Sequence, residues 1–254
     1  MLSQRFSFKL RAYKHKSSKA IRNWWYAIIR IPAGQLAWVL WRSSPLISDR
    51  ILSRRNGIRV FGHLTFVEIP PNSIKRFVLD EDVKRKFMIW PGGWDERARL
   101  LKEHYRHTLM QDLWQNRNKI EKSENYRYLI EKIEAGEPLT RVNKSTLVDT
   151  PQKARKYLLN QLGIFYSLES KGYKPDLADD ELNVAIARDG SLIKANGGRK
   201  RLIAAQILGL PTIPVRVAYV HKSWLAQHTK QGVSRSQALA FAISNAKQLA
   251  RDHG

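Results

Sequence analysis

The segment that most constrains how this chain can fold is residues 183–221, where several structural signals follow one another without a gap. Residues 183–188 alternate polar and apolar side chains, which is typical of a strand with one buried face. Asp189 and Gly190 form a strong two-residue hairpin signal, and residues 191–195 continue as a second strand. This pattern predicts an antiparallel β-hairpin.

A helix and a third strand follow this hairpin. Residues 199–208 carry apolar side chains at helical spacing, and Gly209 ends the pattern. The β-branched residues 212–219 then predict a buried strand. Together these elements predict an α+β fold with a small mixed sheet and packed helices.

The turn before the expected helix is rich in glycine and in positive charge. A glycine turn that opens a helix brings backbone N–H groups, the positive end of the helix dipole and neighbouring cations to one point. Such a point suits a phosphate group. The expected phosphate-binding or nucleotide-binding residues are Asn196, Gly197, Gly198, Arg199, Lys200 and Arg201.

This succession of elements resembles the ParB/sulfiredoxin superfamily, in its ParB N-terminal-like branch. The residues that carry the resemblance are Asp189, Gly190, Gly198, Lys200, Arg201, Ala204, Ala205, Leu208, Gly209, Ile213, Pro214 and Val215. Residues 63–74 resemble the opening strand of that family and the Pro-x-x-Ile turn after it, and residues 91–95 resemble a GG-x-WD segment of ParB-like proteins. The likeness covers roughly residues 61–224.

The resemblance implies a loop that holds the phosphates of a nucleotide. The superfamily includes nucleotide-hydrolysing partition proteins, reductases, small-molecule kinases and reputed nucleases. Gly198 and Arg201 match its G-x-[H/R]-R pattern, whereas Lys200 replaces the usual His or Arg. Lysine keeps the charge but loses the planar, two-pronged geometry of arginine. Arg199 stands where sulfiredoxins have a nucleophilic cysteine, and the chain contains no cysteine, so sulfiredoxin-type reduction is excluded.

The charge of the chain favours polyanionic partners. There are 45 Lys and Arg against 22 Asp and Glu in 254 residues, a formal net charge of +23. Such an excess points to nucleic acid, nucleotides or an anionic membrane surface, although a merely solvated basic surface is the alternative. The lack of cysteine leaves no disulfide framework and no thiolate metal site, so a cytoplasmic protein is expected.

About half of the excess charge lies in residues 1–60, where Asp49 is the single acid. Several tryptophans accompany it, and three interpretations remain open. The basic, Trp-rich extension, residues 1–55, could contact an anionic membrane interface, or it could bind nucleic acid through its cations and aromatic rings. It could also be a helical hairpin that packs its Trp face onto the main domain. Residues 21–41 are interrupted by Arg and Pro, so they do not predict a clean membrane span.

The expected domain organisation follows from these signals. We expect a helical extension over residues 1–55, a ParB/sulfiredoxin-like domain over 56–224 and a C-terminal helix over 225–254. A helical insertion is expected at about residues 95–171. Within it, patterns predict helices at 95–109 and 125–135, and a third helix that starts at Thr150-Pro151 and ends at 171. Residues 58–69 predict one or two strands, and Ser234 with Gln237 predicts a capping box for a helix through residue 249.

A catalytic site would need an acid or a base near the phosphate loop. The candidates are Asp95, which follows a glycine pair, and Glu68 at the end of the first expected strand. Asp189 is most simply a turn residue, and Asp95 could equally be a helix cap. His104 and His107 are one helical turn apart, but no third metal ligand is evident, so no metal site is predicted.

Two classes of function follow. In the first, the loop holds ATP or CTP with Mg²⁺, with NTP hydrolysis or kinase-like phosphoryl transfer assisted by a carboxylate as a further step. In the second, the same loop and the basic N-terminal region bind DNA or RNA without chemistry, or in a nuclease-like way. The first predicts saturable binding that Arg201→Ala abolishes. The second predicts affinity spread over many cations and a steep dependence on salt.

Overall fold

The computed structural model describes residues 30–43, 48–79, 87–141, 146–174, 181–229 and 233–252. The chain divides into two compact units. One comprises residues 34–108 and 164–254, and the other comprises residues 1–33 and 109–163. The larger unit holds the main sheet and the glycine loop.

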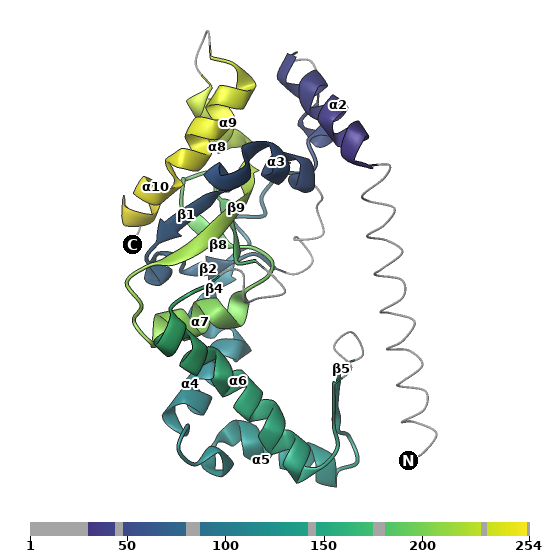
Figure 1. Ribbon diagram of the computed structural model, residues 1–254, viewed down its shortest axis with the longest axis vertical. Coiled ribbons are helices and arrows are strands. Elements are labelled where there is room, and N and C mark those ends of the chain that lie inside the picture. The colour runs from purple at the N-terminus through teal and green to yellow at the C-terminus, as the bar shows by residue number, and fades with distance from the viewer. Residues whose placement is uncertain are drawn as a thin grey trace. The chain divides into compact units, whose positions relative to one another are not determined.

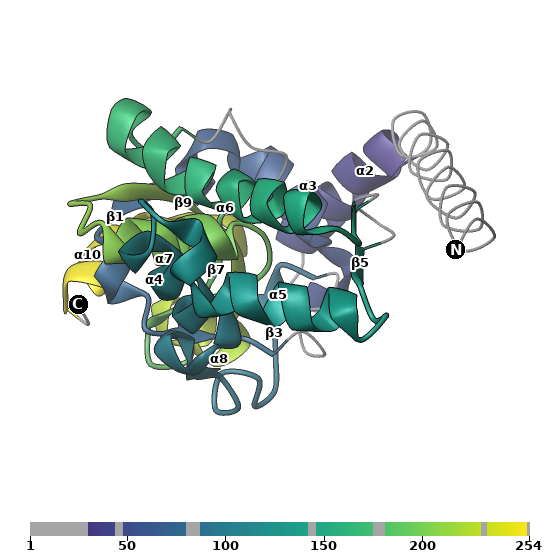
Figure 2. The same cartoon turned by 90° about the horizontal axis from the view of Figure 1, so that it is seen from below.

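The larger unit is built on a mixed sheet of the α+β class (Figure 1). Its strand order is β1-β9-β7-β8-β2-β4, and β3 pairs with β9 away from this path. The strands are β1 (Phe66–Ile69), β2 (Arg76–Phe77), β3 (Ile89–Trp90), β4 (Arg99–Leu100), β7 (Asn183–Ile186), β8 (Leu192–Lys194) and β9 (Ile213–His221). β1 lies alongside β9 in both views (Figures 1 and 2), antiparallel to it.

The hairpin predicted around the Asp-Gly pair is confirmed. β7 and β8 are antiparallel, with Ile186 opposite Leu192. The loop has three residues rather than two, because the Ala187 N–H donates to the Ser191 carbonyl at 3.0 Å. Gly190 supplies the positive φ of 88° that such a loop requires at its last position. The predicted third strand is also confirmed as β9, which runs parallel to β7.

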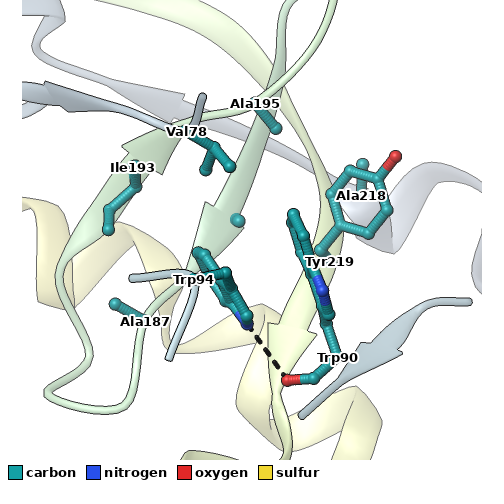
Figure 3. Close-up of a cluster of buried hydrophobic side chains, with 9 residues drawn as sticks. Val78, Trp90, Trp94, Ala187, Ile193, Ala195, Ala218 and Tyr219 are labelled. Atoms are coloured by element: carbon teal, nitrogen blue, oxygen red, sulfur yellow. Dashed lines mark hydrogen bonds between the residues drawn. The ribbon is translucent and has the colours of Figure 1, made fainter. Parts of the chain in front are cut away.

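A β-bulge in β9 places an aromatic cluster over one face of this sheet. Val184 pairs with Val217, but the next residue of β7 pairs with Tyr219, so Ala218 is the extra residue. Ala218 and Tyr219 therefore both reach the face on which two indole rings stack (Figure 3). The rings of Trp90 and Trp94 lie 4.4 Å apart, and Trp90 lies 5.0 Å from the Tyr219 ring. Small side chains make room beneath them: Ala185, Ala187, Ala195 and Ala218.

Helix α7 (Arg199–Ile207) connects β8 to β9. It packs against the short 3₁₀ turn η3 (Pro71–Ser73). The Gln206 side-chain amide donates to the carbonyls of Pro71 and Ile74, at 2.9 and 3.0 Å. These bonds join the expected phosphate-loop helix to the Pro-x-x-Ile turn more than a hundred residues earlier in the chain.

The remaining helices of this unit come from both ends of the chain. They are α2 (Arg30–Ser43), α3 (Arg54–Phe61), α8 (Lys222–His228), α9 (Arg235–Ser244) and α10 (Ala246–Asp252). The first four residues of α2 are assigned to the other unit. The capping box predicted at Ser234 and Gln237 is present. The single helix expected there is interrupted at Asn245, where α9 ends and α10 begins. Of the expected strand residues 58–69, residues 58–61 belong to α3 and Gly62–Thr65 form the 3₁₀ turn η2, so the prediction is confirmed only for β1.

The second unit contains mainly helices. It holds most of α4 (Tyr105–Gln115), then α5 (Glu124–Glu134), the hairpin of β5 (Leu139–Arg141) and β6 (Thr146–Val148), and the first half of α6 (Pro151–Lys171). The bounds of α5 and α6 confirm the predicted helices. The helix expected over residues 95–109 is wrong over 95–104, where the chain forms a turn, β4 and a 3₁₀ turn; residues 105–109 are helical, as the start of α4. Within the described ranges, no helix is both long enough and apolar enough to cross a bilayer.

Candidate functional site

The N-terminal end of α7 is the candidate site that the sequence singled out. Gly198 is its N-cap residue and adopts a left-handed conformation with φ of 61°. The first turn of the helix contains Arg199, Lys200 and Arg201 and no acidic residue. Elsewhere, Ser53, Ser123 and Ser234 cap their helices with a hydroxyl oxygen, whereas Gly198 has no side chain to offer. The positive end of the α7 dipole therefore coincides with three cations.

The glycine pair packs directly on the backbone that enters β7. A Cβ on Gly198 would lie 2.8 Å from the Leu182 Cα, and a Cβ on Gly197 would overlap the Glu181 carbonyl oxygen. Both glycines also have positive φ. Their identity is thus explained by close packing within the protein, independently of any ligand.

The two arginines of the loop lie against different aromatic rings. The Arg199 guanidinium carbon lies 5.1 Å from the centre of the Phe77 ring, and its Nη1 is 2.7 Å from the His104 Nε2. The Arg201 guanidinium carbon lies 5.4 Å from the Tyr173 ring centre. Aromatic faces stabilise cations at such distances. Both arginine side chains of the loop are therefore held against rings of the same unit.

Buried polar groups lie beside this loop on the ends of β7 and β8. Lys194 is fully buried, and its Nζ donates to the carbonyls of Ala195 and Asn183 at 2.8 and 3.2 Å. The side-chain oxygens of Asn183 and Asn196 are buried and accept no hydrogen bond from the described residues. A buried acceptor without a donor is costly unless a water, an ion or a ligand group reaches it.

Asp95 lies in a different polar cluster, at the turn of the β7–β8 hairpin. Asp95 is buried, with 3% of its surface exposed. Its carboxylate accepts two hydrogen bonds from the Arg188 guanidinium at 2.9 Å and a third from the Arg188 backbone N–H at 3.0 Å. The His221 Nε2 lies 3.8 Å from the same carboxylate and donates to the Gly92 carbonyl at 2.8 Å. Burial by itself would raise the pKa of Asp95, but the hydrogen bonds from Arg188 outweigh it and lower that pKa. Asp95 is thus an ionised anchor between the Trp94 turn and the hairpin.

The structure does not bring Asp95 and the loop together. Gly197 packs at the open end of the hairpin against Glu181 and the Asn183 side chain, whereas Asp95 binds at its turn, to Arg188, five residues beyond Asn183. At the rise of a β-strand, this separation is about 16 Å. A phosphate at the tip of α7 is therefore beyond the reach of Asp95.

Glu68 lies at the same end of the sheet as the loop. It is on β1 opposite Pro214, and Asn183 lies opposite Arg216 on the other side of β9. Two strand spacings therefore separate Glu68 from β7, a lateral distance of about 10 Å. Its side chain is exposed. Of the two predicted carboxylates, only Glu68 shares an end of the sheet with the loop.

No group of three or more His, Cys, Asp or Glu side chains could hold a metal ion among the residues that the structure describes. The two histidines considered as a pair have separate surroundings. The ring of His104 contacts Arg199 and stacks on Tyr105 at 4.6 Å, while burial lowers the pKa of His107.

Comparison with protein-family models, with curated proteins and with solved structures gives no match for this chain. The resemblance to the ParB/sulfiredoxin superfamily therefore remains a prediction that rests on the residues quoted above.

Sequence reasoning missed several neighbours of the loop. Phe77, His104 and Tyr173 hold its arginines, yet they are distant in sequence and follow no motif that includes the loop. Lys194 gave a signal that could have been used. It interrupts the apolar residues of β8 with a charge, and a cation within a buried strand usually has dedicated acceptors.

Proposed function

We propose that this protein binds the phosphate groups of a nucleotide at the N-terminal end of α7. The observation that carries the proposal is the coincidence of three consecutive cations with the positive end of a helix dipole. Cations are intrinsically unfavourable at that end of a helix, by about 0.3–1 kcal/mol each. Arg199, Lys200 and Arg201 occupy it in succession, and the first turn contains no acid that would offset them. An anion bound there would reverse the sign of this energy.

The surroundings of the loop support a nucleotide rather than a small inorganic anion. The buried oxygens of Asn183 and Asn196 suit hydrogen-bond donors such as ligand hydroxyl groups, or a cation that accompanies the phosphates. Amide oxygen is a ligand that Mg²⁺ accepts, and Mg²⁺ commonly bridges nucleotide phosphates. ATP or CTP with Mg²⁺ is therefore the proposed ligand. Catalysis by Asp95 is not part of the proposal, because Arg188 already uses both of its oxygens.

Isothermal titration of the full chain with ATP and CTP, with and without Mg²⁺, tests this proposal. Lys200→Ala combined with Arg201→Ala removes two charges from the proposed site, and we expect the affinity to fall at least tenfold, since a charge-assisted bond contributes about 1.5–3 kcal/mol. Lys247→Ala, which removes one exposed charge on α10, is the control and should leave the affinity unchanged. Equal affinities in all three proteins, or no binding by any, would reject the proposal.

Nucleic-acid binding is the second candidate, and the net charge of +23 favours it. In that case the phosphates of DNA or RNA would be neutralised by many cations of the surface. The affinity for a short duplex or single strand would then fall steeply with salt, and the loop variants would lose little more than the Lys247→Ala control. A saturable, loop-dependent site for one nucleotide distinguishes the first candidate from the second.

A further inference from the structure

Helix α2 presents a stripe of aliphatic side chains to solvent. Leu36, Val39 and Leu40 are 60%, 45% and 40% exposed. They are spaced by three and four residues, so they share one face of the helix. Single exposed apolar residues are ordinary, but three large ones on one face of one helix indicate a contact surface.

The opposite face of α2 is fixed to the larger unit, which determines that the aliphatic stripe faces outwards. Trp41 is fully buried, and its Nε1 donates to the Asp49 Oδ1 at 3.1 Å. The Arg235 guanidinium from α9 lies 4.5 Å from the centre of the Trp41 ring and forms an ion pair with Asp49. The Trp38 ring packs edge-on against Phe61 of α3 at 5.3 Å.

The stripe lies in a strongly basic part of the chain. Residues 34–64 contain five arginines and one acid. That acid is Asp49, whose carboxylate is already engaged by Arg235 and lies 3.6 Å from the Lys222 Nζ. Arg42, at the end of α2, and Arg59, on α3, are exposed. Exposed positive charge therefore accompanies the aliphatic stripe on α2 and α3, at Arg42 and Arg59.

We infer that this face of α2 lies on an anionic membrane surface, with Leu36, Val39 and Leu40 among the acyl chains and the arginines at the headgroups. Aliphatic side chains beside cations match a bilayer interface, which is apolar below and negatively charged above. They match nucleic acid poorly, because phosphates are bound by polar and basic side chains and exposed bases stack on aromatic rings. Trp41 is buried, and the half-buried Trp38 already packs against the rings of Trp41 and Phe61.

The sequence before α2 provides the second signal that a lasting membrane contact needs. A single weak anchor binds a membrane only reversibly, and stable attachment takes an apolar element together with a polybasic one. Residues 1–29 contain seven Lys and Arg and no acid, together with Trp24 and Trp25. Each Lys or Arg near an anionic surface strengthens binding about fivefold.

Co-sedimentation of the full chain with vesicles tests the inference. One set of vesicles is phosphatidylcholine, and the other mixes phosphatidylcholine with phosphatidylglycerol. We expect binding to the anionic set only. Leu36→Gln combined with Val39→Gln should weaken it roughly tenfold or more, because two side chains lose their apolar burial. Leu159→Gln combined with Tyr128→Gln, two exposed apolar residues on α6 and α5, is the matched control and should bind like the wild type.

Each alternative outcome overturns the inference in a recognisable way. If the wild type does not bind anionic vesicles, the membrane contact is wrong. If both double variants bind equally well, charge alone attaches the protein and the α2 face has no part in it. If the α2 variant instead loses affinity for DNA or RNA, or loses self-association in sedimentation, the face serves that partner. Because all four substituted residues are exposed, both double variants should fold normally and give the circular dichroism spectrum of the wild type. Nucleotide titration of the α2 variant tests the glycine loop separately from membrane binding.

Discussion

Substitution of Gly198 by alanine tests whether the glycine loop is shaped by the protein's own packing. The new Cβ would lie 2.8 Å from the Leu182 Cα and 2.9 Å from its Cβ, where ordinary carbon contacts are about 3.5–4.0 Å. Leu182 would have to move by several tenths of an ångström, and such overpacking costs about 1–3 kcal/mol. The left-handed conformation, with φ of 61°, costs a non-glycine residue about 1–2 kcal/mol more. We therefore expect a loss of about 3 kcal/mol in the free energy of unfolding.

Gly209, which follows α7, is a matched control. Its φ of 66° is nearly the same, but a Cβ there would have no atom within 4 Å. Gly209→Ala should therefore cost only the conformational part, about 1–2 kcal/mol. In a chain of this size, 1 kcal/mol corresponds to roughly 2–4 °C in the midpoint of thermal unfolding. We expect a decrease of about 6–12 °C for Gly198→Ala and of about 2–8 °C for Gly209→Ala.

Thermal unfolding followed by circular dichroism, without ligand, measures both variants. Equal decreases for the two would refute the reasoning, because the contact with Leu182 would then contribute nothing. If Gly198→Ala also abolished nucleotide binding while its unfolding midpoint matched that of Gly209→Ala, the glycine would be required for the approach of the ligand.

Two further predictions concern the aromatic cluster and its polar border. Asp95→Asn should lower stability by about 2 kcal/mol near neutral pH, since it weakens the bonds to Arg188. Because the folded state lowers the pKa of Asp95, the carboxylate stabilises the fold above about pH 4, and this stabilisation is lost as the pH falls below that. In urea unfolding from pH 7 to 3, the stability of the wild type should therefore converge on that of the variant. A difference in stability that stays constant with pH would contradict this. Ala185→Leu should cost about 1–3 kcal/mol by overpacking beneath Trp94, measured by the same unfolding, whereas Ala226→Leu on the exposed side of α8 should cost almost nothing.

Much of the local structure could be predicted because its causes lie within a few residues. The proline at the first position of α6 and the capping box at Ser234 each defined a helix start, and both helices begin where expected. The Asp-Gly pair likewise defined the hairpin. The prediction failed at the start of residues 95–109, where tertiary contacts outweigh an apolar spacing that is typical of a helix. There, Asp95 is drawn to Arg188 and a short strand pairs with β2 before α4 begins.

The candidate site shows the same division. The sequence identified the loop itself, since the glycines, the cations and the helix after them are consecutive. It could not predict that Asp95 lies about 16 Å from that loop along the hairpin, because a carboxylate 93 residues from its arginine carries no local sign of the pairing. Nor could it predict which rings receive Arg199 and Arg201, since these contacts depend on how distant segments fold back onto α7.

Most turns, caps and strands, and the strong positive charge, follow from residue type and nearest neighbours, because backbone conformation and ionisation respond to them directly. Which polar groups share an environment depends on the folded structure. It placed Asp95 with Arg188 instead of with the glycine loop, and it turned Trp41 of α2 inwards and the aliphatic residues of that helix outwards. The physical reason is that burial and pairing are properties of the assembled sheet and helices, and a side chain acquires its partners only when segments far apart in the chain pack together.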